Sequence, residues 1–247
     1  SYEAAAGSPH AVTLTVTDDR APNLQGAATF LWVVQDTNRP PVVADKFYPG
    51  TPAQLRGAVE QYLLAALPPL GPRPLALVAP HAGYVFSGQI AADAYRQAQP
   101  HAYDVVVILG TCHTAGGFSG MSVYQGDGFQ TPLGVAAIDT EVAAALLAAD
   151  RAITGAPEVH VREHSVEVQV PFVQVAFPGV RIVAGVVGAV DPATATRLGR
   201  ALADALAAQR TGPRTAAATR RRDAPSSRAA RGGAAGGHLA RLVAVAR

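Results

Sequence analysis

Two histidines follow apolar runs that predict neighbouring strands, and they are the residues best placed to do chemistry. His81 comes after the run 75–79 and Pro80, and His113 comes shortly after the run 105–109. In open parallel sheets, ligands bind at the carboxyl ends of the strands. Neighbouring strands lie about 4.8 Å apart, so side chains from two such ends can converge on one ion, and paired imidazoles suit a transition metal. Each histidine could instead be a polar loop residue.

The residues beside these histidines offer further chemistry. The turn from His81 to Gly88 leads into a predicted helix whose first amides could bind an anion, although ordinary strand-to-helix turn chemistry also explains it. Tyr84 could present its hydroxyl to the pocket or only pack its ring. Cys112, next to His113, could be a nucleophile or a soft metal ligand, or an inert small apolar residue.

A third cluster spans residues 162–172 and fits two backbone conformations. Alternating valines favour a strand, whereas Val166, Val170 and Phe177 also fit one face of a helix. In a helix, His164 and Glu167 would lie one turn apart, where they could share a proton or where the carboxylate could orient the ring. A salt bridge at the start of a helix is the alternative interpretation.

Strands and helices alternate from residue 42 onward, and they would hold these side chains in place. Pro52 after Thr51, and Pro192 after Asp191, are typical of helix starts, and Asp139 can cap a third helix. We therefore expect an α/β fold, a mostly parallel sheet flanked by helices. The expected helices cover 52–66, 88–97, 140–149 and 192–208, and the expected strands cover 75–79, 105–109, 130–138 and 181–187.

The ends of the chain differ from this middle part, which we place at 42–209. Residues 1–41 contain two alternating runs, 12–17 and 29–34, that predict a hairpin-like strand pair. This pair resembles the closing strands of extracellular β-sandwich repeats, so it could be the remnant of a neighbouring domain.

Residues 210–247 have a composition unlike the rest of the chain. They hold nine arginines against Asp223 alone, a net charge of +8, whereas residues 1–209 carry −6. With few apolar residues before Leu239, we expect 210–238 to be disordered. The tail could be genuine, or it could be the product of a shifted reading frame in GC-rich DNA. Because it has no aromatic residue for stacking on bases, we expect no specific nucleic-acid site.

Composition excludes several other classes of protein. No apolar run approaches the roughly 18–20 residues of a membrane-spanning helix, and residues 1–10 lack the order of a secretory signal. Cys112 is the only cysteine, which excludes an internal disulfide and a multi-cysteine zinc site. We expect a soluble protein with no membrane partner.

Five motifs together resemble the Memo family, whose bacterial and archaeal members are called AmmeMemoRadiSam system protein B. They lie at 47–49, 79–88, 108–113, 131–134 and 164–172. The resemblance implies a fold similar to that of class III extradiol dioxygenases, with a metal pocket at the strand ends and His81 as a ligand. The family takes its second ligand from a Gly-Pro-Ser-His-His motif. Here the residues from Gly110 read Gly-Thr-Cys-His-Thr, so His113 aligns with the first histidine and Thr114 stands where the family ligand would be.

The chain departs from the family pattern beyond about residue 208. A Ser-Ser-Asp-x-Ser-His segment and a late Cys-Gly segment, which supply further pocket residues in the family, are absent. We therefore expect a two-histidine site, His81 and His113, that holds metal weakly, and a core that lacks one central strand.

The function that we expect is metal binding by His81 and His113, with His164 and Glu167 as catalytic residues and Tyr84 and Cys112 in the pocket. Iron or copper would serve redox or dioxygenase-like chemistry on a small molecule. The alternatives are a non-catalytic protein that binds a phosphopeptide or another anion, and an inactive, C-terminally truncated family member. The resemblance implies the cytoplasm, whereas the strand pair suggests an exported fusion. The sequence leaves the oligomeric state open.

Overall fold

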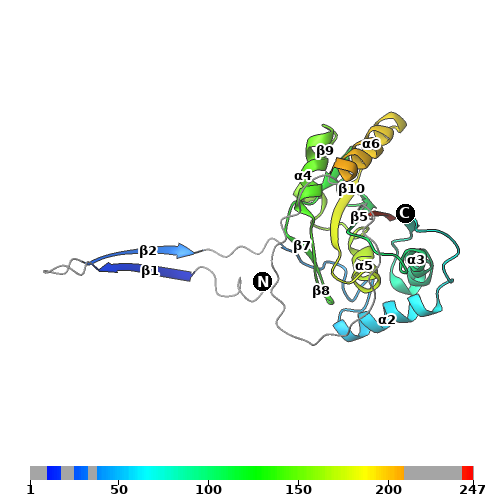
Figure 1. Ribbon diagram of the computed structural model, residues 1–247, viewed down its shortest axis with the longest axis horizontal. Helices are drawn as coiled ribbons and strands as arrows, with labels where there is room; N and C mark the ends of the chain where they lie inside the picture. Colours follow the sequence, from blue (N-terminus) through cyan, green and yellow to red (C-terminus); the bar gives the residue numbers. More distant parts are fainter. Residues whose placement is uncertain (1–9, 18–24, 33–37, 209–240, 247) are drawn as a thin grey trace, which may run out of the picture. The chain divides into compact units, whose positions relative to one another are not determined.

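The computed structural model describes residues 10–17, 25–32, 38–208 and 241–246 (Figure 1). The chain divides into two compact units, Ser1–Asn38 and Arg39–Arg247, so the division falls slightly before the boundary expected at residue 41. The disorder expected at 210–238 lies outside the described residues. No helix among the described residues is both long enough and apolar enough to cross a bilayer.

The first unit contains the predicted pair of strands. Strand β1, His10–Thr17, pairs antiparallel with β2, Gln25–Trp32, in a register that sets His10 opposite Trp32 and Thr17 opposite Gln25. Alternating Val and Thr residues in β1 favour extended backbone, because branched side chains fit a pleated surface. The hairpin-like pair is therefore confirmed.

The second unit is built on a six-stranded sheet in the order β4-β11-β5-β10-β6-β9. Every neighbouring pair is parallel except β10 and β6, which confirms the mostly parallel α/β fold. The apolar run of β5 is buried on both faces, as expected of a central parallel strand. The strands are β4 Ala76–Ala79, β5 Val105–Thr111, β6 Met121–Val123, β9 Ile153–Thr154, β10 Arg181–Val187 and β11 Arg241–Ala246. A smaller sheet joins β3 Asn38–Arg39, β7 Gly128–Thr131 and β8 Gly134–Ala137.

Two groups of helices pack around this sheet. Helices α2, α3 and α5 contact one another, and α4 and α6 form a second pair that is separated from them by β5 and β10 (Figure 1). Asp139 caps α4 as predicted, because its Oδ1 accepts a hydrogen bond from the amide of Val142 at 3.2 Å. The helices are α2 Pro52–Ala65, α3 Tyr84–Ala98, α4 Thr140–Ala149, α5 Val170–Ala176 and α6 Pro192–Ala208, with short 3₁₀ helices η1 Pro157–Val159 and η2 Glu167–Gln169.

Strand β11 corrects the expectation that the core lacks a central strand. It lies between β4 and β5, parallel to both, with Val243 opposite Ala76 on one side and Val107 on the other. Leu242 and Ala244 are fully buried there. The six residues 241–246 lie within the segment 210–247, whose composition is unlike the rest of the chain, yet their alternating small and branched side chains form a strand of the sheet.

Candidate metal centre

His81 and His113 meet at the carboxyl edge of the sheet. His81 follows β4 and His113 follows β5, and their Nε2 atoms lie 3.4 Å apart. We expected the two strands to be adjacent, but β11 lies between them. The rings nevertheless converge, since each histidine stands beyond the end of its strand.

His164 joins the pair and makes a cluster of three imidazoles. Its ring centroid lies 5.6 Å from that of His81 and 4.8 Å from that of His113. One ligand atom from each of the three residues lies within 4.8 Å of the others. The structure therefore brings together three of the histidines singled out in the sequence, drawn from three separate segments of the chain.

The segment that carries His164 is neither the strand nor the continuous helix considered from the sequence. Residues 160–166 form turns between η1 and η2, and α5 begins only at Val170. Gly110 permits this segment to approach β5, because a Cβ at position 110 would overlap Ser165 Oγ. The Ser165 hydroxyl donates a hydrogen bond to the carbonyl of Thr111 at 2.9 Å, which fixes the segment against the strand.

Glu163 is the carboxylate of the cluster, although the sequence motifs did not indicate it. Its Oε2 accepts a hydrogen bond from the amide of His113 at 2.6 Å, and its Oε1 lies 3.1 Å from the Nδ1 of the same residue. Oε1 also accepts from the amides of His164 at 2.8 Å and Ser165 at 3.0 Å. One buried side chain thus contacts two of the three histidines.

These contacts set the charge of the site. Burial alone would raise the pKa of Glu163, but hydrogen bonds from the amides of His113 and Ser165 and from the His113 ring lower it to about 2. The carboxylate is therefore ionised at neutral pH. Burial lowers the pKa of His164, and the nearby His113 adds to that effect against the opposing influence of Glu163. Burial therefore favours the neutral form of His164, which has a lone pair available to a ligand.

Glu167 does not occupy the position expected for it beside His164. It is completely buried, and it accepts hydrogen bonds from the Tyr48 hydroxyl at 2.7 Å and from the amide of Val43 at 3.0 Å. Its counter-charge is Arg39, whose Nη1 lies 2.5 Å from Glu167 Oε2. The carboxylate that contacts His164 Nδ1 is instead Glu163, at 3.4 Å.

Tyr84 and Cys112 contribute less to the cluster than the sequence suggested. The Tyr84 hydroxyl donates to the carbonyl of Val168 at 2.8 Å, and its ring is buried, so it packs the core and does not present its hydroxyl to the histidines. Cys112 is partly buried against the core, with its Sγ 3.6 Å from the carbonyl of Ala115. Its position fits the small apolar role weighed for it.

Several hydrogen-bond donors of the turn after His81 are engaged within the protein. The amide of Tyr84, the first residue of α3, donates to the carbonyl of Phe47 at 2.7 Å. The Ser87 hydroxyl donates to the carbonyl of Ala82 at 2.9 Å. These contacts are those of a strand-to-helix turn, the simpler of the two interpretations that the sequence offered.

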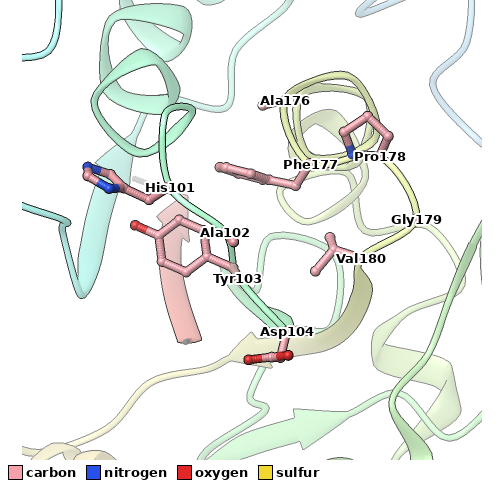
Figure 2. A pocket seen from close by; sticks show the side chains of 9 residues that line it. All are labelled: His101, Ala102, Tyr103, Asp104, Ala176, Phe177, Pro178, Gly179 and Val180. Atoms are coloured by element: carbon pink, nitrogen blue, oxygen red, sulfur yellow. The ribbon is translucent and has the colours of Figure 1, made fainter. Parts of the chain in front are cut away.

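A depression of about 420 Å³ lies at the opposite edge of the sheet (Figure 2). Asp104 and Val180, which line it, stand just before the first residues of β5 and β10. Figure 2 shows the rings of Tyr103 and Phe177 lining the same hollow, and these rings pack edge to face at 5.3 Å. Because ligands of open α/β sheets bind at the carboxyl ends of strands, the histidine cluster is the better candidate site.

Comparison with known proteins agrees with the motifs. A family model described as Memo-like protein matches residues 39–212. A MEMO1 family protein of Methanopyrus kandleri is 38% identical over 176 residues, which cover 67% of this chain and 62% of that protein. A relative in Methanothermobacter thermautotrophicus is 38% identical over 68% of this chain and 63% of the relative. Another in Metallosphaera sedula is 37% identical over 58% of this chain and 54% of the relative. The chain thus spans less than two thirds of the length of these relatives. With the family model covering most of its length, the chain belongs to the Memo-like protein family.

Proposed function

We propose that this protein binds a redox-active transition metal ion, iron or copper, through the imidazoles of His81, His113 and His164. The observation that carries the proposal is the 3.4 Å separation of the Nε2 atoms of His81 and His113. Two ligands of a tetrahedral ion with metal–nitrogen bonds of about 2.0–2.1 Å lie about 3.3–3.4 Å apart. This pair of nitrogens therefore already has the spacing that one shared ion requires.

The third imidazole supports the same conclusion. Its ligand atom lies within 4.8 Å of the other two, so the three side chains together could hold one ion. Catalytic metal sites usually have three protein ligands and one open position, and imidazole suits iron, copper, zinc and nickel. His164 would thus be a third ligand, in addition to the two histidines expected from the sequence, and we expect tighter binding than from two histidines.

The exposure of the cluster fits a site that meets a small molecule. The side chain of His113 is 39% exposed and that of His164 is 21% exposed, so an ion held there would be accessible from solvent. When bound, iron or copper would supply Lewis-acid and redox chemistry. Burial favours the neutral form of the His164 ring, which offers a lone pair, and the ionised carboxylate of Glu163 would offset the charge of a cation.

Metal analysis of the full chain tests the proposal. We expect iron or copper near one equivalent in the purified protein, and a loss of at least tenfold in affinity in His81→Ala and in His164→Ala. His101→Ala is the matched control, because His101 lies at the opposite edge of the sheet and should leave metal content unchanged. Retention at the wild-type level by His81→Ala would refute the assignment. A metal-free protein that binds phosphate or a phosphopeptide would favour the anion-binding alternative.

A further inference from the structure

We propose that Glu163 is a positioning residue, which holds the rings of His113 and His164 with their Nδ1 atoms toward its carboxylate and thereby directs Nε2 of His113 toward His81. The inference rests on the proposed metal site, and it adds a residue that neither the sequence motifs nor the cluster of ligands assigns.

Glu163 holds His113 at two points. Oε2 accepts from the main-chain amide at 2.6 Å, and Oε1 lies 3.1 Å from the ring Nδ1. Because one carboxylate contacts both the backbone and the ring of His113, the His113 side chain has little rotational freedom. The opposite ring nitrogen, Nε2, is the atom that lies 3.4 Å from Nε2 of His81.

The same carboxylate also shapes the turn that carries His164. Oε1 accepts from the amides of His164 and Ser165, at 2.8 and 3.0 Å, and it lies 3.4 Å from the Nδ1 of His164. Glu163 therefore ties the turn at 163–165 to the loop after β5. Among the described residues, the Glu163 carboxylate is the acceptor that His113 and His164 share.

The ionised carboxylate also selects which nitrogen of a neighbouring imidazole carries the proton. An ionised carboxylate only accepts hydrogen bonds, so a neutral imidazole that contacts it must carry its proton on Nδ1. That tautomer leaves the lone pair on Nε2, and carboxylates that orient metal-binding histidines act in this way. Glu163 is only 2% exposed, and Arg39 Nη2 donates to its main-chain carbonyl, so both its side chain and its backbone are fixed.

The tautomer of His113 in the wild-type chain tests the inference before any metal is added. We would record ring ¹⁵N and ¹H correlations of the metal-free full chain at pH 8, with His113→Gln used to assign the signals. The expected result is a proton on Nδ1 and a bare Nε2. A ring that carries its proton mainly on Nε2 would overturn the proposal, whatever the behaviour of any variant.

Metal titration of Glu163→Gln provides the second test. Both carboxylate oxygens of Glu163 accept hydrogen bonds from backbone amides. In either orientation of the glutamine amide, its NH₂ group would face one of these N–H donors. Because two donors repel each other, we expect the turn and the loop to separate. We expect affinity for added Cu²⁺ to fall by about 10–100-fold, with an altered copper EPR spectrum. Glu158→Gln, the same change at an exposed position in η1, should match the wild type.

The outcomes separate this inference from the proposed function. If the wild type binds copper, His81→Ala does not, and Glu163→Gln binds like the wild type, the positioning role is refuted and the metal site stands. If the wild type binds no metal while His113 carries its proton on Nδ1, the metal site fails and the orienting role of Glu163 is supported. Circular dichroism shows whether Glu163→Gln folds, and an unfolded variant leaves the decision to the tautomer measurement.

Discussion

Replacing Arg39 with methionine should destabilise the second unit, because it leaves the carboxylate of Glu167 buried without its counter-charge. The two side chains are 5% and 0% exposed, and Nη1 lies 2.5 Å from Oε2. The guanidinium also donates to the carbonyls of His160 and Glu163. Removing one side chain therefore deprives three acceptors of a donor at once.

The size of the effect follows from these contacts. Breaking a buried ion pair by removing one partner costs about 3–5 kcal/mol. Glu167 keeps donors from the Tyr48 hydroxyl and from the amides of Val42 and Val43, so we expect the lower end of that range. In a domain of this size about 3 kcal/mol lowers the melting temperature by about 6–12 °C.

A double-mutant cycle provides the assay. Urea denaturation followed by circular dichroism would compare the wild type, Arg39→Met, Glu167→Gln and the double variant. The double variant should lose less free energy of unfolding than the sum of the single variants, because it contains no unpaired buried charge. Losses that add within about 0.5 kcal/mol would refute the reasoning, since coupled residues deviate from additivity by more than that.

Two further predictions concern glycines and pH. Gly57→Ala in α2 should raise the free energy of unfolding by about 0.5–1 kcal/mol, because nothing lies within 4 Å of the added Cβ and alanine restricts the unfolded chain. The matched change Gly88→Ala in α3 should lower it, since the Cβ would meet the Tyr62 ring at 2.6 Å; equal effects in thermal denaturation would contradict the packing argument. Burial lowers the pKa of His160 from 6.5 to about 4. Between these pH values His160 binds a proton in the unfolded state but not in the folded state, so the free energy of unfolding should fall as the pH drops from 6.5 to 4. The loss should total about 3 kcal/mol, and His160→Gln should flatten the pH dependence of urea denaturation over that window; an unchanged slope would exclude His160 as its source.

Most of the architecture could be predicted from local signals. Pro52 and Pro192 mark helix starts, Asp139 caps a third helix, and the run at 105–109 becomes the buried strand β5. These features depend on a few consecutive residues, whose chemistry is visible in the sequence. Strand β11 could not be found in this way, because six residues in an arginine-rich composition become a strand only when β4 and β5 offer two edges to pair with.

The site could be predicted in part, for a related reason. His81 and His113 were identifiable because strand ends gather ligands. Glu163 was not identifiable from the sequence. Only a helix or a strand was considered for 162–172, and in both of these the side chains of consecutive residues point in different directions, so the Glu163 carboxylate would point away from His164. The backbone there forms a turn, so the carboxylate folds back onto the amides of His164 and Ser165.

The position of β11 also bears on how the protein folds during synthesis. Thr111 and Ala246 are in contact although 135 positions separate them in the chain. Until the ribosome has made residues 241–246, β4 and β5 each present an unpaired edge to solvent or to other nascent chains. Such late, long-range pairing is slow, and it exposes partly folded chains to aggregation. A version of this protein shortened before residue 241 should therefore require chaperones to stay in solution.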